Sequence, residues 1–125
     1  MSNITSSNEL ISLSQTQPDL LQALRLQLMK DFGSGFNPTE ISVNIETSAQ
    51  QLVQDSVSYL KPIFLSNRTQ FMSILYRVDL PEKSYLRLLL KAENLQTKEH
   101  VVDDITMALL NRALQKVLTR RIHRS

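Results

Sequence analysis

The chain has 125 residues, of which 42% are hydrophobic and 21% charged, and its net charge is +2. This length suits one domain, and this composition is ordinary for a globular chain. The sequence contains no cysteine, which excludes disulfides, thiol catalysis and zinc–thiolate sites and favours a reducing, cytoplasmic compartment. No run approaches the roughly 18 apolar residues of a membrane span. The first twenty residues lack the basic start and continuous apolar core of a signal peptide.

Residues 1–15 are polar and rich in Ser and Asn, and they are predicted to form a flexible N-terminal tail, or one helical turn that docks through Leu10 and Ile11. Residues 16–125 are predicted to form a single helical domain. The stretch from Thr16 to Asp19 has the composition of a helix start, with a capping Thr, a Pro in the first turn and an acid. Leucines then recur at spacings of three and four as far as Phe32, and Gly33 ends the pattern.

The next stretch is predicted to be a connector followed by a long helix. Residues 33–38 contain Gly-x-Gly, but they follow a helix and lack a third glycine, so they favour a loop over a phosphate cradle. Apolar and polar residues alternate from Ile41 to Ile45, which predicts a short extended segment. Thr47–Gln50 resembles a capping box for a helix that Pro62 should bend or end near residues 59–61.

Three further helices complete the predicted fold. Asn67 is a candidate cap for the first. Asp79–Glu82 has an acid, a Pro and a Glu at the spacing of a helix start, and is expected to begin the second. Thr97 is a candidate cap for the third, which runs to Arg124. Five helices with short links predict an all-α orthogonal bundle with a long C-terminal helix.

The C-terminal helix carries an apolar face and a basic face. Its first half should be buried on the side where its second half is basic. The basic residues have no acid near them in the sequence after Asp104, and they are the candidate residues for binding an anion or a partner. The simpler interpretation is a solvated helix end whose cations complement the helix dipole. The candidates are Arg112, Lys116, Arg120, Arg121 and Arg124.

Two stretches carry a resemblance to a known family. They are Leu75–Glu82, which runs Leu-Tyr-Arg-Val-Asp-Leu-Pro-Glu, and Arg112–Val117, which contains Gln-Lys. Together they resemble a family of small uncharacterised bacterial all-helical proteins, over roughly residues 50 to 121. The resemblance implies a cytosolic helical protein and carries no assigned activity.

Within the first stretch, four polar residues are a candidate structural cluster: Tyr76, Arg77, Asp79 and Glu82. The spacing of Asp79 and Glu82 suits a capping box, and Arg77 sits where a cation complements a helix end. We expect Arg112 or Lys116 of the last helix to reach this corner and lock it.

The sequence shows no motif for catalysis, for a cofactor or for a metal. His100 and Asp104 are four residues apart, but a metal site needs more donors than these. The chain is therefore predicted not to be an enzyme and to bind no cofactor. The favoured function is a protein–protein interaction module, as a homodimer through the C-terminal helix and the segment 41–45 or with an unknown protein partner. The alternative is a nucleic-acid-binding module that uses the basic C-terminal helix.

Overall fold

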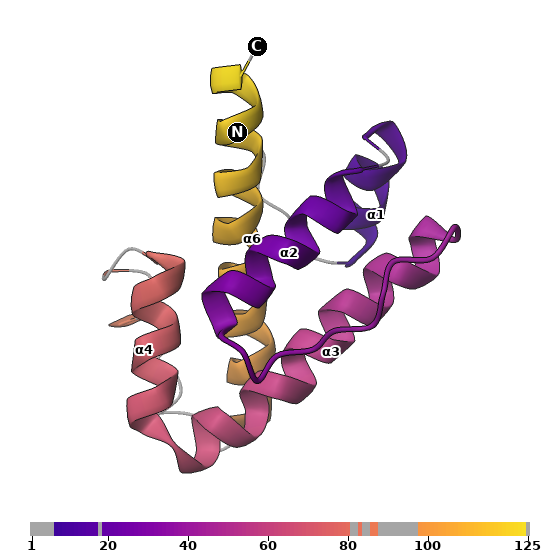
Figure 1. The fold of residues 1–125 in the computed structure, drawn as a ribbon. Coiled ribbons are helices and arrows are strands. Elements are labelled where there is room, and N and C mark those ends of the chain that lie inside the picture. The colour runs from indigo at the N-terminus through magenta and orange to yellow at the C-terminus, as the bar shows by residue number, and fades with distance from the viewer. Residues whose placement is uncertain (1–6, 18, 81–82, 84–85, 88–97, 125) are drawn as a thin grey trace.

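The computed structural model describes residues 7–17, 19–80, 83, 86–87 and 98–124 of the chain. Within these ranges the chain forms helices that pack against one another, and no strand (Figure 1). The all-α class and the long C-terminal helix are therefore confirmed. Five helices have assigned bounds: α1 Ser7–Thr16, α2 Leu20–Phe32, α3 Ile45–Ser66, α4 Arg68–Val78 and α6 Lys98–Arg124.

Of the two predictions for residues 1–15, the docking helix is the one that residues 7–15 form, and it is longer than the single turn expected; residues 1–6 lie outside the described residues. Ser7–Thr16 is helical, and Leu10 and Ile11 are buried in the core. Their burial against α3 supplies the free energy that local propensity lacks, because each fully buried side chain contributes about 1.5–3 kcal/mol. Thr16 ends α1 and does not cap α2, since its Oγ1 donates to the carbonyl of Leu13 at 2.8 Å.

The connector between α2 and α3 is held to its neighbours by side chains, and its residues 41–44, in the segment predicted to be extended, form no strand. It runs back along α3, as Figure 1 shows. Arg25 of α2 donates to the carbonyls of Pro38 and Thr39, and the N–H of Thr39 donates to Asp55 of α3. Ile41 contacts the core and is half-buried. The alternating pattern thus reflects single anchor residues along a loop.

The cap at the start of α3 lies three residues before the predicted cap, Thr47. Asn44 is the N-cap, and its Oδ1 accepts a hydrogen bond from the N–H of Thr47 at 3.0 Å. At the other end, Pro62 lies inside the helix, which continues to Ser66. A proline there removes one backbone hydrogen bond and costs about 3 kcal/mol. Burial of Leu60 and Phe64 on either side of Pro62 offsets that cost.

Asn67 caps α4 as predicted, because its Oδ1 accepts from the N–H of Gln70. Asp79 has a different role from the predicted helix start. It ends α4 in the left-handed conformation (φ 62°), and its N–H donates to Tyr76 while that of Leu80 donates to Leu75. This is a Schellman-type C-cap, whereas an N-cap needs extended backbone. Glu82, most of the helix expected after it and Thr97 lie outside the described residues.

The last helix, α6, is the element against which α2, α3 and α4 all pack. Its buried residues include Val102 and Ile105 near the start and Leu114 and Val117 further along. Ile122 is 68% exposed, and Figure 1 shows the last turns of α6 reaching beyond α2. Among the described residues, no helix is both long enough and apolar enough to cross a membrane.

Candidate functional site

A buried carboxylate lies where the C-terminal ends of α2 and α4 meet α6. Asp31 of α2 is only 4% exposed. Its Oδ2 pairs with Nζ of Lys116 of α6 at 3.1 Å, and its Oδ1 accepts from Nε2 of Gln27 at 3.1 Å. A buried carboxylate is costly unless it is paired and hydrogen-bonded, and here both conditions hold.

Arg77 of α4 caps the end of α2 from the neighbouring helix. Its Nε donates to the backbone carbonyl of Asp31 at 2.9 Å, and a terminal nitrogen donates to that of Phe32 at 3.3 Å. The last four carbonyls of a helix lack partners within it, so a cation from outside satisfies two of them. Gly33 makes this approach accessible, since a Cβ there would lie 3.2 Å from the guanidinium.

Cations from α6 cap the end of α4 in the same way. Lys116 donates to the backbone carbonyl of Arg77 at 3.1 Å. Arg112 donates through Nε to the carbonyl of Asp79 at 3.0 Å and pairs with its carboxylate at 3.1 Å. The contact expected between the last helix and this corner is therefore present for Arg77 and Asp79. Tyr76 is 88% exposed and takes no part in it.

The same corner contains a cavity of about 470 Å³. Its described lining carries five cations and one acid. The neutral members of the lining, Gln27 and Thr119, add hydrogen-bonding groups. The lining residues are Gln27, Lys30, Asp31, Arg77, Arg112, Lys116, Thr119 and Arg120. Three of the five predicted basic residues, Arg112, Lys116 and Arg120, thus face one cavity.

The other two predicted basic residues, Arg121 and Arg124, do not line this cavity among its described residues. Arg121 points to the start of α2, where it donates to Gln17 and forms a two-bond pair with the carboxylate of Asp19 at 3.0 and 3.2 Å. The side chain of Arg124 lies outside the described residues. Three members of the predicted stripe, Arg112, Lys116 and Arg121, therefore pair with carboxylates of the same chain.

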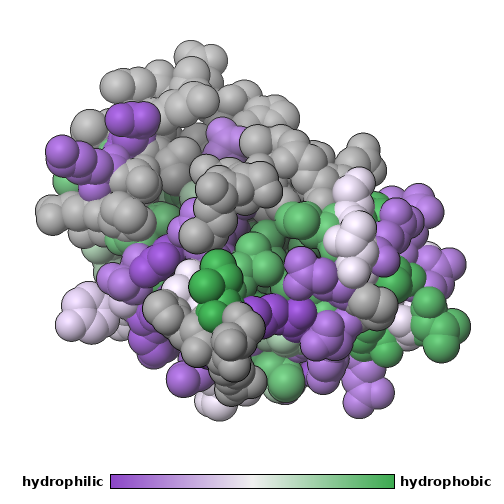
Figure 2. All heavy atoms as spheres, turned by 90° about the horizontal axis from the view of Figure 1, so that it is seen from above, coloured by the Kyte–Doolittle hydropathy of each residue, from purple (hydrophilic) through white to green (hydrophobic). Residues whose placement is uncertain are grey.

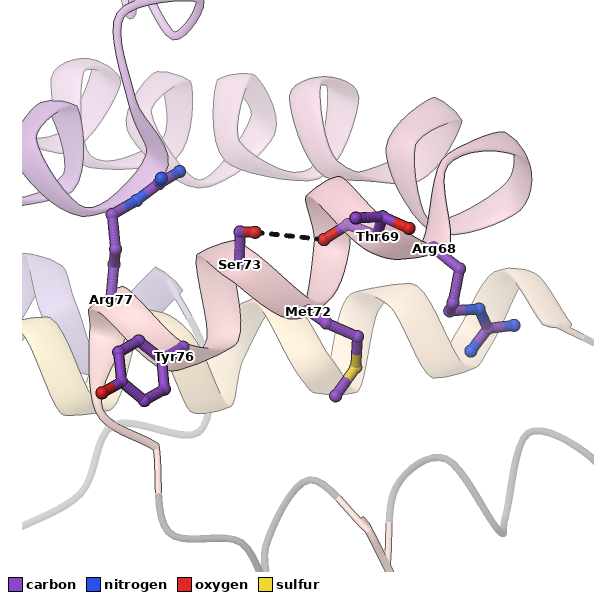
Figure 3. Close-up of a pocket in the computed structure, with 6 residues that line it drawn as sticks. All are labelled: Arg68, Thr69, Met72, Ser73, Tyr76 and Arg77. Atoms are coloured by element: carbon purple, nitrogen blue, oxygen red, sulfur yellow. Dashed lines mark hydrogen bonds between the residues drawn. The ribbon is translucent and has the colours of Figure 1, made fainter.

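A second surface lies on the outer side of α4. A groove of about 600 Å³ is lined there by described residues of that helix alone. In Figure 3, Tyr76, Met72 and Arg68 point to one side of α4, and Arg77 points to the other. The guanidinium of Arg68 lies 4.9 Å from the centre of the Phe64 ring, within cation–π range.

Sequence reasoning missed Asp31 and the outer face of α4, although signals for both exist. Asp31 follows Leu24 by seven residues and so falls on the apolar stripe of α2, where a carboxylate needs a partner. Met72 and Tyr76 lie four residues apart on one face of the helix, and this is not the face that contains Phe71 and Ile74. Their positions therefore indicate that they lie outside the core.

Comparisons with known proteins add no assignment to these sites. No protein-family model, no curated protein and no solved structure matches the chain significantly. The resemblance to a bacterial helical family therefore stays a prediction. Within the described part of the chain, no three His, Asp or Glu side chains gather where they could hold a metal ion.

Proposed function

We propose that the chain is a protein–protein interaction module whose binding surface is the outer face of α4. The observation that carries this proposal is the exposure of Tyr76 (88%) and Met72 (37%) beside a groove of about 600 Å³. Tyr, Met and Arg are enriched at protein interfaces, and Tyr and Arg dominate their energetic hot spots. All three residue types occur together on this face.

The charge of α4 narrows the chemistry of the partner. The helix contains Arg68 and Arg77 and no acidic residue. Residues 61–125 hold twelve cations and six acids, a net charge of +6. A partner of opposite charge is attracted to such a surface, and like charges are repelled. The proposed partner is therefore an apolar segment of another protein that carries Asp or Glu at its flanks.

A homodimer through α6 and residues 41–45 has less support. The apolar residues of α6 between Val102 and Val117 are used by the core of the same chain. Val43 and Ile122 are exposed, but single apolar side chains on a surface are normal. On the face of the molecule that Figure 2 shows, green apolar side chains lie between purple polar ones over the coloured part. A second copy of the chain is accordingly one outcome of the test below.

Nucleic-acid binding through the basic C-terminal helix is the alternative. It would depend on Arg120, with Arg124, because Arg112, Lys116 and Arg121 pair with carboxylates within the chain. Since phosphate contacts weaken steeply with salt, raising the salt concentration separates this alternative from an apolar interface. A cytoplasmic location belongs to the proposal and rests on the cysteine-free composition.

Site-specific photocrosslinking tests the proposal. A photoreactive phenylalanine derivative replaces Tyr76 in one variant and Val43 in a control, which is also fully exposed but lies on the connector. We expect the probe at position 76, and not the one at position 43, to capture one protein. The capture should persist at high salt and after nuclease treatment. The crosslinked peptide of that protein should contain apolar and acidic residues. Capture of a second copy of the chain, equal capture at both positions, or loss of capture with nuclease would each contradict the proposal.

A further inference from the structure

We propose that the cavity between α2, α4 and α6 binds a small dianion that bears a phosphate group. Among the described lining residues the cavity shares only Arg77 with the groove on the outer face of α4, and it does not depend on the interaction proposed for that face. The cavity measures about 470 Å³, within the range of about 300–1,000 Å³ that is usual for small-molecule sites. Three helices contribute its lining, so its cations converge on one volume.

The balance of charge in the cavity favours an anion. Its five cations are Lys30, Arg77, Arg112, Lys116 and Arg120. Asp31 neutralises Lys116, and Asp79 neutralises Arg112. Arg77 is bonded to backbone carbonyls, which are uncharged acceptors. Three positive charges, those of Lys30, Arg77 and Arg120, therefore lack a carboxylate partner among the described residues.

The ends of two helices reduce this excess without removing it. The C-termini of α2 and α4 meet at the corner, and each is equivalent to roughly −0.5 of an elementary charge. About two positive charges then remain uncompensated, which matches the charge of a phosphate monoester. Two of the three cations concerned, Arg77 and Arg120, are arginines, whose planar guanidinium groups bind phosphate oxygens in pairs.

The arrangement suits a compact anion better than a nucleic-acid backbone. A backbone needs cations along an extended track. Beyond the cavity, Arg121 turns to Asp19 and Gln17 at the start of α2. Lys30 and Arg120 are exposed members of the lining, so they can close on a ligand without breaking the pairs of the corner.

Isothermal titration calorimetry with phosphate and with pyrophosphate, at constant ionic strength, tests the proposal. We expect saturable one-to-one binding, with a dissociation constant below about 1 mM for the better ligand. The double variant Lys30→Gln and Arg120→Gln should weaken binding about tenfold or more, because it removes two of the three uncompensated charges while the buried pairs stay in place. Circular dichroism checks that its fold is kept.

The matched control neutralises one arginine and one lysine outside the cavity, Arg68→Gln with Lys83→Gln. It should bind as the original chain does. Equal weakening in both double variants would mean that the anion responds only to net charge and would overturn the site. Absence of saturation up to about 10 mM would also overturn it. A third result would overturn the site by assigning the cavity to nucleic acid. In that result a single-stranded oligonucleotide binds more tightly than pyrophosphate, and the double variant of Lys30 and Arg120 weakens its binding as much.

Discussion

The buried pair between Lys116 and Asp31 should be a sensitive point of the fold. The change Lys116→Met removes the ammonium group and keeps an apolar stem of similar length. It leaves the carboxylate of Asp31, 5% exposed, with Gln27 as its side-chain partner. It also removes the bond from Lys116 to the carbonyl of Arg77, so the ends of α2 and α4 both lose a contact with α6.

The expected cost lies between two limits. Removal of one partner of a buried pair costs about 3–5 kcal/mol, whereas an exposed pair contributes only about 0–1 kcal/mol. The side chain of Lys116 is 21% exposed, so water can reach the remaining carboxylate in part. We therefore expect Lys116→Met to lower the free energy of unfolding by about 2–3 kcal/mol. That is a large fraction of the 5–15 kcal/mol typical of a domain.

A double-mutant cycle with Asp31→Asn isolates the interaction. Urea unfolding followed by far-UV circular dichroism gives the free energy for each single variant and for the double variant. The double variant should be more stable than the sum of the single effects predicts, by about 1 kcal/mol or more, because no buried charge is left unpaired. Lys30→Met, an exposed lysine of the same corner, serves as the control and should change stability by less than about 0.5 kcal/mol. Additive effects within about 0.5 kcal/mol would refute the assignment of Asp31 and Lys116 as a coupled pair.

Two further predictions concern the backbone and the core. Gly33 has φ 100° and ψ 175°, a region used almost only by glycine, and a Cβ there would also crowd Arg77. Gly33→Ala should lower the free energy of unfolding, measured with a chemical denaturant, by about 1–3 kcal/mol. Gly35→Ala is the control and should lower it less, because the φ of Gly35 is not in the positive range. Equal losses of stability would contradict the backbone argument. The hydroxyl of Ser14 is buried and has no hydrogen-bond partner among the described residues. Ser14→Ala should therefore leave the melting temperature unchanged or raise it. Ser56→Ala removes a hydrogen bond to the carbonyl of Leu52 and should lower it. A lower melting temperature in both variants would show that the Ser14 hydroxyl has a hydrogen-bond partner.

The helical class could be predicted from the sequence because it depends on periodic apolar residues. Leucines of α2 recur at spacings of three and four, and almost all of that face is buried. Capping by a side chain next to the helix start is also a local property, which is why Asn67 was identified correctly. For α1, no such signal decided between a flexible tail and a docking helical turn. Its helix depends on burial of Leu10 and Ile11 against a segment more than thirty residues away, and no local pattern encodes that contact.

Caps that use groups from elsewhere in the chain were the main source of error. Asp79 has the sequence context of a helix start, yet it ends α4, because Arg112 from a distant helix binds both its carbonyl and its carboxylate. Thr16 has the same ambiguity, although its hydroxyl bonds locally, to the carbonyl of Leu13 at the end of α1. A polar residue two positions before a proline marks a helix boundary, but the sequence does not show whether it serves the helix before or the helix after.

The basic face of α6 is best explained by where two other helices end. Each helix leaves carbonyl groups without partners at its C-terminus, and burying such an end without donors is unfavourable. The ends of α2 and α4 meet against α6, and Arg77, Arg112 and Lys116 supply the donors. The lysine and arginine side chains that gather at these helix ends carry more positive charge than the carboxylates and helix ends of the corner neutralise. A structural role and an anion site are therefore not competing explanations, because the first creates the conditions for the second. It follows that a ligand in the cavity should stabilise the contact of all three helices, so anion binding and resistance to unfolding should rise together.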